Sequence, residues 1–279
     1  MLITGQAVAQ KILLETKNQI EQAGITPGLG VILVGDDAPS HLYVGIKERR
    51  AKELGIYFEK KVFPDSVSQD VIERAIADFN ADKKIHGIIV QIPLPEHLDT
   101  ESIIACIDPK KDTDGFHPET LEKFLAGETA LLPVFPRALL ELAKSVEGDT
   151  SEKKALVIIN SELMGKVLSA ALNQSGFEVT QAFADEKELI AKIVPEQSVV
   201  LTAVGVPNTV SAVSAKPGSI FVDGGIYYDE DDKVVGDVTR DDGVYREDVL
   251  VTKVPGGVGP VTVAVLLARV TEAALMRIL

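Results

Sequence analysis

Residues 39–47 read PSHLYVGIK and are the predicted start of a helix that stops at Gly55. Proline and serine favour the first turn of a helix and glycine favours the position just past its end, so the pattern predicts a helix over residues 39–54. Tyr43 and Lys47 then stand four positions apart on one helical face. A lysine shielded from water loses part of its preference for the charged form and can transfer protons near neutral pH. The alternative is a surface lysine whose alkyl chain covers a half-buried tyrosine.

Strand patterns flank this helix. An apolar run at residues 29–34 precedes it, an alternating segment at 56–63 follows it, and an apolar run at 87–92 comes after a second helical pattern at 67–80. This β-α-β-α-β order predicts a parallel sheet. Gln91 falls at the carboxyl end of the last strand, the edge at which open α/β sheets bind ligands.

A second α/β series predicts a doubly wound sheet of the dinucleotide-binding kind. The charged connection KDTDGFHP at residues 111–118 separates it from the first series. The sequence VPGGVGPVT at residues 254–262 precedes a final apolar helix, and the free amides of a helix N-terminus can receive a ligand oxygen; a plain glycine-rich turn is the alternative. The remaining predicted helices are 6–23, 100–107, 136–146, 165–176, 186–194 and 263–279, and the remaining predicted strands are 155–159, 178–182, 198–204 and 219–223.

Composition narrows the class of protein. The chain has 279 residues, enough for one large or two modest domains, and its net charge of −14 argues against nucleic acid and against an anionic membrane surface as partners. It has no basic leader and no apolar run of about 18 residues, so we expect a cytoplasmic protein without a membrane partner. Cys106 is the only cysteine, which excludes an intrachain disulfide. No His, Cys and carboxylate cluster has metal-ligand spacing, and we expect no metal.

Four separated motifs together resemble the methylenetetrahydrofolate dehydrogenase/methenyltetrahydrofolate cyclohydrolase family, and they occur in the order that the family has. They are Y-x3-K at residues 43–47, HGIIVQIPLP at 86–95, KDTDGFHP at 111–118 and VPGGVGP at 254–260. The resemblance implies two α/β domains. One is a folate-binding catalytic domain of residues 1–118 plus 257–279, completed by the C-terminal helix, and the other is a Rossmann-type doubly wound domain of residues 119–256. It also implies a cytoplasmic homodimer that binds tetrahydrofolate derivatives and serves purine biosynthesis.

The resemblance also implies residue roles. Lys47 would be the catalytic proton-transfer group, Gln91 would assist it, and Tyr43 would stack on the folate and assist Lys47. Asp114 would hold the pterin through its amino and ring N–H groups, a role suited to an ionised carboxylate; a turn or helix-cap aspartate is the alternative. The residues implied to line the folate site are Gly257, Gly259 and Pro260.

The dinucleotide-binding part departs from the family pattern. Residues 157–167 read VIINSELMGKV where the family has VVGRSxxVGxP. Ile159 stands where a glycine lets the backbone approach the cofactor, and Asn160 stands where an arginine meets the 2′-phosphate of NADP. Ser161 keeps the pattern, and GSIFVDGGI at residues 218–226, ending at Ile226, still resembles the family.

Two further departures bear on the cofactor. Near the end of the next strand Ala184 and Glu186 replace a serine and a threonine of the family, and like-charge repulsion from Asp185 and Glu186 would disfavour the phosphate of NADP there. A carboxylate about 20 residues beyond the first turn favours the unphosphorylated ribose of NAD. Phe135 replaces a threonine near the expected nicotinamide position, where its ring would fill space that the cofactor needs. The resemblance thus implies NADP, the residues favour NAD, and a chain with no cofactor stays open.

The sequence predicts an enzyme that hydrolyses 5,10-methenyltetrahydrofolate to 10-formyltetrahydrofolate, with oxidation of 5,10-methylenetetrahydrofolate by NAD(P) as a second activity left open. Two alternatives remain. One is a degenerate relative that binds folate without turnover, as a reservoir or partner subunit. The other is an unrelated dehydrogenase with a Rossmann domain.

Overall fold

The computed structural model describes residues 1–129, 131–146, 150–231, 233–239 and 246–277. The chain forms two compact units. The six-stranded unit comprises Met1–Ala9 and Phe135–Thr262, and the three-stranded unit comprises Gln10–Val134 and Val263–Leu279. The expected divisions after residues 118 and 256 therefore differ from those of the compact units, which also place the first nine residues with the six-stranded sheet.

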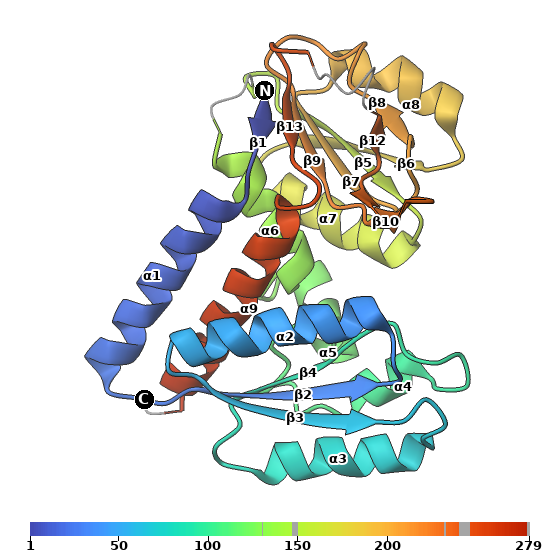
Figure 1. The fold of residues 1–279 in the computed structure, drawn as a ribbon. Coiled ribbons are helices and arrows are strands. Elements are labelled where there is room, and N and C mark those ends of the chain that lie inside the picture. Colours follow the sequence, from blue (N-terminus) through green and yellow to red (C-terminus); the bar gives the residue numbers. More distant parts are fainter. Residues whose placement is uncertain (130, 147–149, 232, 240–245, 278–279) are drawn as a thin grey trace. The chain divides into compact units, whose positions relative to one another are not determined.

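The three-stranded unit contains the predicted parallel sheet, in the order β3-β2-β4. Its strands are β2 (Gly28–Val34), β3 (Tyr57–Phe63) and β4 (Gly87–Val90), and helices α2 (Ala38–Glu53) and α3 (Gln69–Ala81) connect them. The β2-to-β3 and β3-to-β4 connections cross the sheet in opposite directions, so right-handed crossovers place α2 and α3 on opposite faces, as Figure 1 shows. β4 is shorter than predicted because pairing with β2 ends at Val90.

Helix α3 packs on this sheet through a buried stripe. Ile72, Ala75, Ile76 and Phe79 recur at helical spacing and all are buried. The Phe79 ring lies directly over Gly30 of β2, where an added Cβ would come within 2.9 Å of ring carbon Cδ2. Gly30 therefore allows the close approach of helix and sheet.

The remaining helices of the chain include one that the sequence did not predict, α5. Helix α9 begins five residues before the predicted start, and residues 278–279 of that prediction lie outside the described part of the chain. By length and composition α9 could cross a membrane, but 67% of it is buried inside the protein, as expected of a core helix. These helices are α1 (Gln6–Ala23), α4 (Thr100–Ala105), α5 (Pro118–Leu125), α6 (Val134–Lys144) and α9 (Val258–Leu275).

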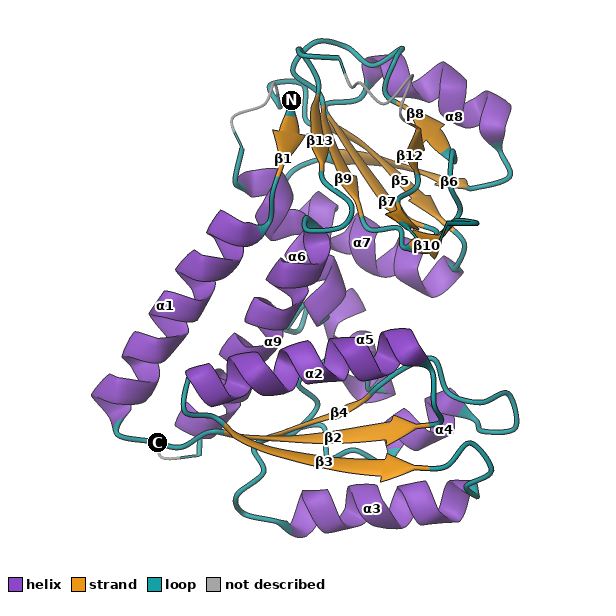
Figure 2. Ribbon diagram, viewed as in Figure 1, coloured by secondary structure: helices purple, strands orange, loops and turns teal. Residues whose placement is uncertain are grey.

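The six-stranded unit is a parallel sheet in the order β1-β13-β9-β7-β5-β6 (Figure 2), which confirms the predicted doubly wound fold. The chain leaves β5 toward β6 and then returns past it to β7, so the direction of winding reverses between β5 and β7. The main elements are β1 (Leu2–Ile3), β5 (Lys154–Ile159), α7 (Glu162–Gln174), β6 (Glu178–Phe183), α8 (Lys187–Ile193), a 3-10 turn (Val194–Glu196), β7 (Val199–Ala203), β9 (Ile220–Asp223) and β13 (Leu250–Thr252).

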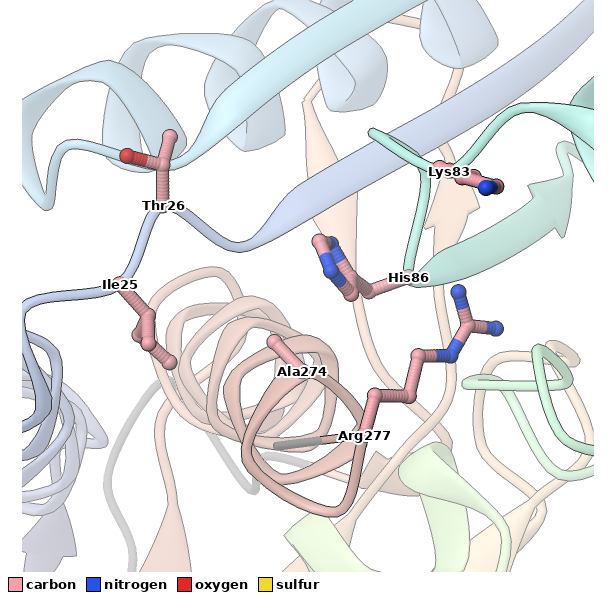
Figure 3. A pocket seen from close by; sticks show the side chains of 6 residues that line it. All are labelled: Ile25, Thr26, Lys83, His86, Ala274 and Arg277. Atoms are coloured by element: carbon pink, nitrogen blue, oxygen red, sulfur yellow. The ribbon is translucent and has the colours of Figure 1, made fainter. Parts of the chain in front are cut away.

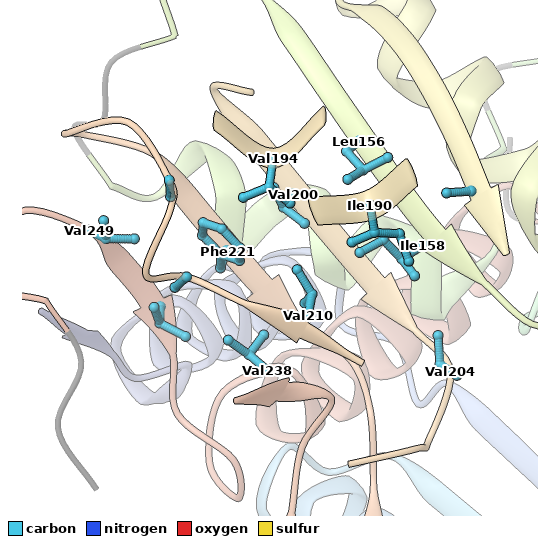
Figure 4. Packing of buried hydrophobic residues seen from close by; sticks show 14 residues of the cluster. Leu156, Ile158, Ile190, Val194, Val200, Val204, Val210, Phe221, Val238 and Val249 are labelled. Atoms are coloured by element: carbon cyan, nitrogen blue, oxygen red, sulfur yellow. The ribbon is translucent and has the colours of Figure 1, made fainter. Parts of the chain in front are cut away.

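One apolar cluster holds α8 and the adjoining loops against this sheet (Figure 4). Leu156, Ile158 and Phe221 come from the strands, and Ile190 and Val194 come from α8 and the turn after it. Burying a side chain of this size contributes about 1.5–3 kcal/mol. Four two-residue strands complete the unit: β8 (Val210–Ser211) with β12 (Val238–Thr239), and β10 (Tyr227–Tyr228) with β11 (Val234–Val235).

Candidate active site and dinucleotide site

Helix α2 carries the tyrosine and lysine of the first motif. Asp37 caps its start by accepting the Ser40 N–H at 2.8 Å, and the helix ends just before Gly55, whose φ of +76° suits glycine. The predicted helix is therefore confirmed. Its buried residues Ser40, Val44 and Ala51 face the interior, and Lys47, at positions i+3 from Val44 and i−4 from Ala51, lies half-buried on the same face.

Lys47 and Gln91 are in direct contact. The Lys47 Nζ donates to Gln91 Oε1 at 2.8 Å, and the Gln91 Nε2 donates to the Ile92 carbonyl at 2.8 Å. Gln91 directly follows β4, and its backbone N–H donates to the Ile32 carbonyl of the neighbouring β2. This hydrogen bond fixes the backbone from which the Gln91 side chain extends. Two residues from separate parts of the chain thus meet at the carboxyl edge of the sheet, as the sequence predicts.

The KDTDG motif extends this edge. Ile88 and Asp112 form a parallel bridge, which places the motif alongside β4. The Asp112 carboxylate accepts the N–H groups of Gly115 and His117, each at 2.9 Å, and Gly115 takes a φ of +84°. Asp112 is therefore the turn aspartate of the motif, and the side chain of Asp114 is left for another role.

Lys111 fixes the motif to helix α3. Its buried Nζ donates to the carbonyls of Phe79, Asn80 and Asp82 at 2.7, 2.7 and 2.9 Å. These carbonyls lie at the C-terminal end of the helix, where acceptors lack partners within the helix and a cation is favoured. Lys111 thus caps α3 while it holds the backbone that leads to Asp114.

Replacing Lys111 by methionine is expected to lower the free energy of unfolding by about 1.5–3 kcal/mol, because hydrogen bonds to a charged group are lost from buried acceptors. Thermal denaturation followed by circular dichroism measures the change. Lys110→Met is the matched control, since Lys110 is exposed. Equal melting temperatures for the two variants would contradict the capping role.

Asp114 and Lys47 influence each other's ionisation. Burial raises the pKa of Asp114, an effect that the Lys47 ammonium opposes. Burial likewise lowers the pKa of Lys47, and the Asp114 carboxylate opposes that shift. The two groups therefore lie within electrostatic reach, and Lys47, Gln91 and Asp114 form one cluster at the edge of the three-stranded sheet.

Arg269 of α9 belongs to this cluster and was not predicted. It is 3% exposed, donates from Nη2 to the Leu132 carbonyl, and its charge lowers the pKa of Asp114. The Asp114 carbonyl in turn accepts the Val134 N–H at 2.9 Å. An arginine within the apolar run at residues 258–275 is the signal that could have found it, because a charge is rarely buried without a partner.

The other implied folate residues lie elsewhere in the chain. Tyr43 is half-buried on α2, one turn before Lys47. Gly257, Gly259 and Pro260 belong to the six-stranded unit, and helix α9 already begins at Val258, so Gly259 and Pro260 lie inside its first turn. The expectation that all the glycines precede the helix was therefore wrong for Gly259. A role for these residues in folate binding stays a prediction.

The predicted dinucleotide residues follow the carboxyl ends of neighbouring strands. Ile159 ends β5, while Asn160 and Ser161 come directly after it; Glu186 follows β6 and Ile226 follows β9. This edge of a doubly wound sheet is where dinucleotides bind. Their part in cofactor binding stays a prediction.

Ile159 does not extend from this edge. Its side chain is 0% exposed and packs under α7, where a Cβ added to Gly165 would come within 2.6 Å of Ile159 Cδ1. Gly165 thus provides the close packing of helix on strand that dinucleotide-binding turns need. The Ser161 side chain makes no cap hydrogen bond, which leaves first-turn amides of α7 for an anion. The residues present therefore fit a dinucleotide.

Asn160 and Glu186, the two replacements that bear on binding of a 2′-phosphate, each have a side chain fixed by a hydrogen bond to the backbone. Asn160 Nδ2 donates to the Val204 carbonyl at 2.8 Å, so its amide is tied to the end of β7. Glu186 Oε2 accepts the Phe183 N–H at 2.6 Å, so its carboxylate is fixed at the end of β6. Phe135 is half-buried, and its ring tip Cζ lies where a Cβ on Gly224 would come within 2.8 Å.

Two buried aspartates shape the same edge: Asp223 lies within the family-like stretch at residues 218–226, and Asp237 lies in no motif singled out in the sequence. Asp237 is 0% exposed and accepts the N–H groups of Val204, Gly205 and Val206 at 2.9, 2.8 and 3.0 Å. Asp223, at the end of β9, accepts those of Gly225, Asp237 and Val238, each at 3.0 Å. This pair, the aspartate clasp, joins the loops after β7 and β9. Among the described residues no group of three or more His, Cys, Asp or Glu side chains could hold a metal ion.

A Rossmann-type sheet in a chain with a second α/β unit, here one that carries the Lys47, Gln91 and Asp114 cluster, is typical of a dinucleotide-dependent enzyme. Comparison with known families matches residues 3–114 to the tetrahydrofolate dehydrogenase/cyclohydrolase catalytic domain and residues 133–278 to the NAD(P)-binding domain of the same enzymes. The chain therefore belongs to the tetrahydrofolate dehydrogenase/cyclohydrolase family, which confirms the resemblance seen in the sequence.

Individual relatives agree along the whole length. The bifunctional protein FolD of Streptococcus agalactiae serotype Ia is 37% identical over 278 residues, covering 98% of this chain and 97% of that protein. The crystal structure of the bifunctional enzyme FolD from Campylobacter jejuni has a TM-score of 0.90 at 33% identity and covers 99% of both chains. That of the Trypanosoma brucei enzyme, complexed with NADP and an inhibitor, has a TM-score of 0.89 at 30% identity, covering 99% of this chain and 97% of that one.

Proposed function

We propose that this chain interconverts one-carbon units of tetrahydrofolate, hydrolysing 5,10-methenyltetrahydrofolate to 10-formyltetrahydrofolate and oxidising 5,10-methylenetetrahydrofolate. The contact between Lys47 Nζ and Gln91 Oε1 at 2.8 Å carries the proposal, together with the electrostatic link from Lys47 to Asp114. Full-length similarity to bifunctional relatives supports both activities. It does not favour the non-catalytic alternative or an unrelated dehydrogenase.

In the hydrolytic step, water adds to the cationic carbon between the two folate nitrogens, and the carbon–N5 bond then breaks. The attacking water loses one proton on addition and N5 gains one as the carbon–N5 bond breaks; the remaining hydroxyl proton leaves for solvent as the formyl carbonyl forms. Neutral Lys47 is suited to take the first proton and supply the second, because burial lowers its pKa. Gln91 holds one N–H of the amine, which orients the nitrogen lone pair. Asp114 as a carboxylate can accept hydrogen bonds from the pterin.

Loss of methenyl absorbance on addition of the protein tests the hydrolysis. Calorimetry with folate, NAD and NADP on the same preparation separates the alternatives. Hydrolysis above the uncatalysed rate supports the proposal. Folate binding without turnover would select the non-catalytic binder, and tight dinucleotide binding without folate affinity would contradict the proposed folate chemistry.

The Asp114→Asn variant tests the coupling through pH. The Asp114 charge raises the pKa of Lys47, so removing it lowers that pKa further. Because the neutral amine accepts the proton, the rising limb of kcat for hydrolysis is expected to move to lower pH, while KM increases through loss of the pterin contact. The uncatalysed rate is subtracted at each pH. A rising limb that moves to higher pH would contradict the coupling.

We propose NAD as the preferred cofactor for the oxidation. When bound, a nicotinamide dinucleotide supplies the hydride acceptor. Glu186 is held by the Phe183 N–H at the strand end where a 2′-phosphate would suffer like-charge repulsion, and Asn160 provides no cation there. The relative from Trypanosoma brucei was solved with NADP, so a preference for NAD would set this chain apart from it.

Reduction of NAD and NADP at the nicotinamide absorbance, driven by 5,10-methylenetetrahydrofolate, measures the preference. Glu186→Gln is expected to raise kcat/KM for NADP about five- to tenfold while that for NAD changes less, because a carboxylate is removed from the phosphate's surroundings. Glu188→Gln is the matched control, since Glu188 is an exposed carboxylate in the first turn of the same helix. Efficient NADP use by the unmodified protein would refute the proposal.

We further propose a cytoplasmic homodimer that supplies one-carbon units for purine biosynthesis. The family resemblance supports all three statements, and an exposed free thiol at Cys106 suits a reducing compartment. Sedimentation equilibrium of the purified protein tests the assembly. A monomer at micromolar concentration would contradict the dimer without affecting the hydrolysis.

A further inference from the structure

A pocket opens in the three-stranded unit at the end of the sheet opposite to Gln91. Its volume is about 410 Å³ and its walls are Ile25, Thr26, Lys83, His86, Ala274 and Arg277 (Figure 3). His86 directly precedes β4 and Gln91 directly follows it, so five residue steps along the strand separate the two places, roughly 16 Å at about 3.3 Å per residue. The pocket is therefore distinct from the Lys47 cluster.

The lining is cationic and polar. Lys83 and Arg277 are basic, His86 can become so, Thr26 offers a hydroxyl, and no carboxylate among the described residues lines the pocket. This is unusual for a chain of net charge −14. Ile25 and Ala274 form the apolar part of the lining, while Thr26, Lys83 and Arg277 are exposed, so an anion can reach their donors from solvent.

The basic side chains of the pocket have N–H donors that are available to a ligand. Arg277 has five N–H donors, and its Nη1 bonds to the Ile85 carbonyl at 3.2 Å, which orients the guanidinium. No ion pair joins Lys83 to any residue in the described part of the chain. His86 Nδ1 is shielded from solvent and has no hydrogen-bond partner among the described residues, so the bonding of the imidazole is incomplete.

The charges around the pocket repel one another. Burial, then Arg277 and then Lys111, lowers the pKa of His86, and Arg277 also adds to the effect of burial in lowering the pKa of Lys111. A hydrogen bond with the Lys84 backbone and then the Asp82 carboxylate oppose the pKa shift of His86, while the carboxylates of Asp108 and Asp82 oppose that of Lys111. Asp82 also accepts the Lys84 N–H at 2.8 Å within its own loop. An anion in the pocket would offset this repulsion.

We propose that this pocket is a binding site for a small oxyanion, a phosphate group in preference to a carboxylate, held by Arg277, Lys83 and Thr26 beside His86. A tetrahedral phosphate can accept hydrogen bonds from several directions at once, which suits donors that come from three segments of the chain. Arginine and lysine are the residues that most often recognise phosphate. The site does not depend on the folate chemistry proposed above.

Isothermal titration calorimetry with inorganic phosphate, in a low-salt buffer free of other oxyanions, tests the site. Arg277→Gln and Lys83→Gln are each expected to weaken phosphate binding about tenfold or more, because each removes a charge-assisted hydrogen bond. Lys84→Gln is the matched control: Lys84 is the exposed neighbour of Lys83, does not line the pocket, and its replacement changes the net charge equally.

Two further measurements make the test of the phosphate site more specific. Acetate titrated in place of phosphate is expected to bind more weakly, and tighter acetate binding would overturn the preference for phosphate. In a histidine-resolved NMR titration, saturating phosphate is expected to raise the pKa of His86, and Arg277→Gln is expected to remove most of that phosphate effect. The hydrolysis rate of Arg277→Gln should match the unmodified protein, which shows that the variant folds. No phosphate binding, or equal weakening by Lys84→Gln, would refute the site.

Discussion

Replacing Lys47 by methionine is expected to lower kcat for methenyltetrahydrofolate hydrolysis by about a hundredfold to ten-thousandfold, the range of a single acid-base group. Methionine keeps the length and the apolar stem of lysine but cannot carry a proton. Its thioether also leaves Gln91 Oε1 without the donor that lies 2.8 Å away in this structure. Initial rates of methenyl absorbance loss, corrected for the uncatalysed reaction, measure the effect.

Lys52→Met is the matched control for Lys47→Met. Lys52 lies on the same helix, is largely exposed, and pairs with Glu48 at 2.6 Å in an ion pair that contributes little at the surface. Its replacement should leave hydrolysis unchanged. A Lys47→Met rate within twofold of the unmodified protein would show that another group moves the proton, and the assignment of the active site would have to be withdrawn.

The second large effect is expected from Asp237→Ala. The substitution removes the acceptor of three backbone N–H groups, from Val204, Gly205 and Val206, in a place where water does not replace it. We expect a loss of about 3–5 kcal/mol in the free energy of unfolding of the six-stranded unit, since buried donors are left unsatisfied. Urea denaturation measures it as a lower midpoint.

Two companion variants keep this prediction specific. Asp237→Asn retains one carbonyl oxygen as an acceptor and should fall between the unmodified protein and Asp237→Ala. Asp231→Ala removes an exposed carboxylate from the same unit and should change the midpoint little. If Asp237→Ala and Asp231→Ala had the same midpoint, the aspartate clasp would not stabilise the loops after β7 and β9.

The order of elements was predictable because it depends on local patterns. The helix that carries Lys47 has a proline in its first turn and a glycine past its end, and the buried strands β2 and β5 are continuous apolar runs. Such signals act within a few residues and need no knowledge of distant contacts. Strand β1 is two residues long and exists because β13, near the other end of the chain, pairs with it. No local pattern predicts a strand of that kind.

The residues of the candidate site also fall into two groups, those predictable from local patterns and those whose roles depend on distant contacts. Lys47, Gln91 and Asp114 were found through motifs, and Gln91 also through its place at the end of a strand. Asp112, Arg269 and Asp237 were not found, because their roles are hydrogen bonds to backbone groups or a charge beside another segment. An aspartate looks the same in a sequence whether it faces a ligand or a row of amides. That the Ile159 side chain packs under α7 could not be predicted either, because this packing depends on Gly165 six residues later; the part of Ile159 in cofactor binding stays a prediction.

The way in which the chain passes between the two compact units has a practical consequence for engineering. Neither unit is one contiguous segment, and the divisions fall after Ala9, Val134 and Thr262, within or at the ends of helices α1, α6 and α9. A chimera that exchanges the cofactor module with that of a relative must therefore use three crossover points and must carry the first nine residues along. A chimera joined at only the two later points would pair β1 of one parent with β13 of the other.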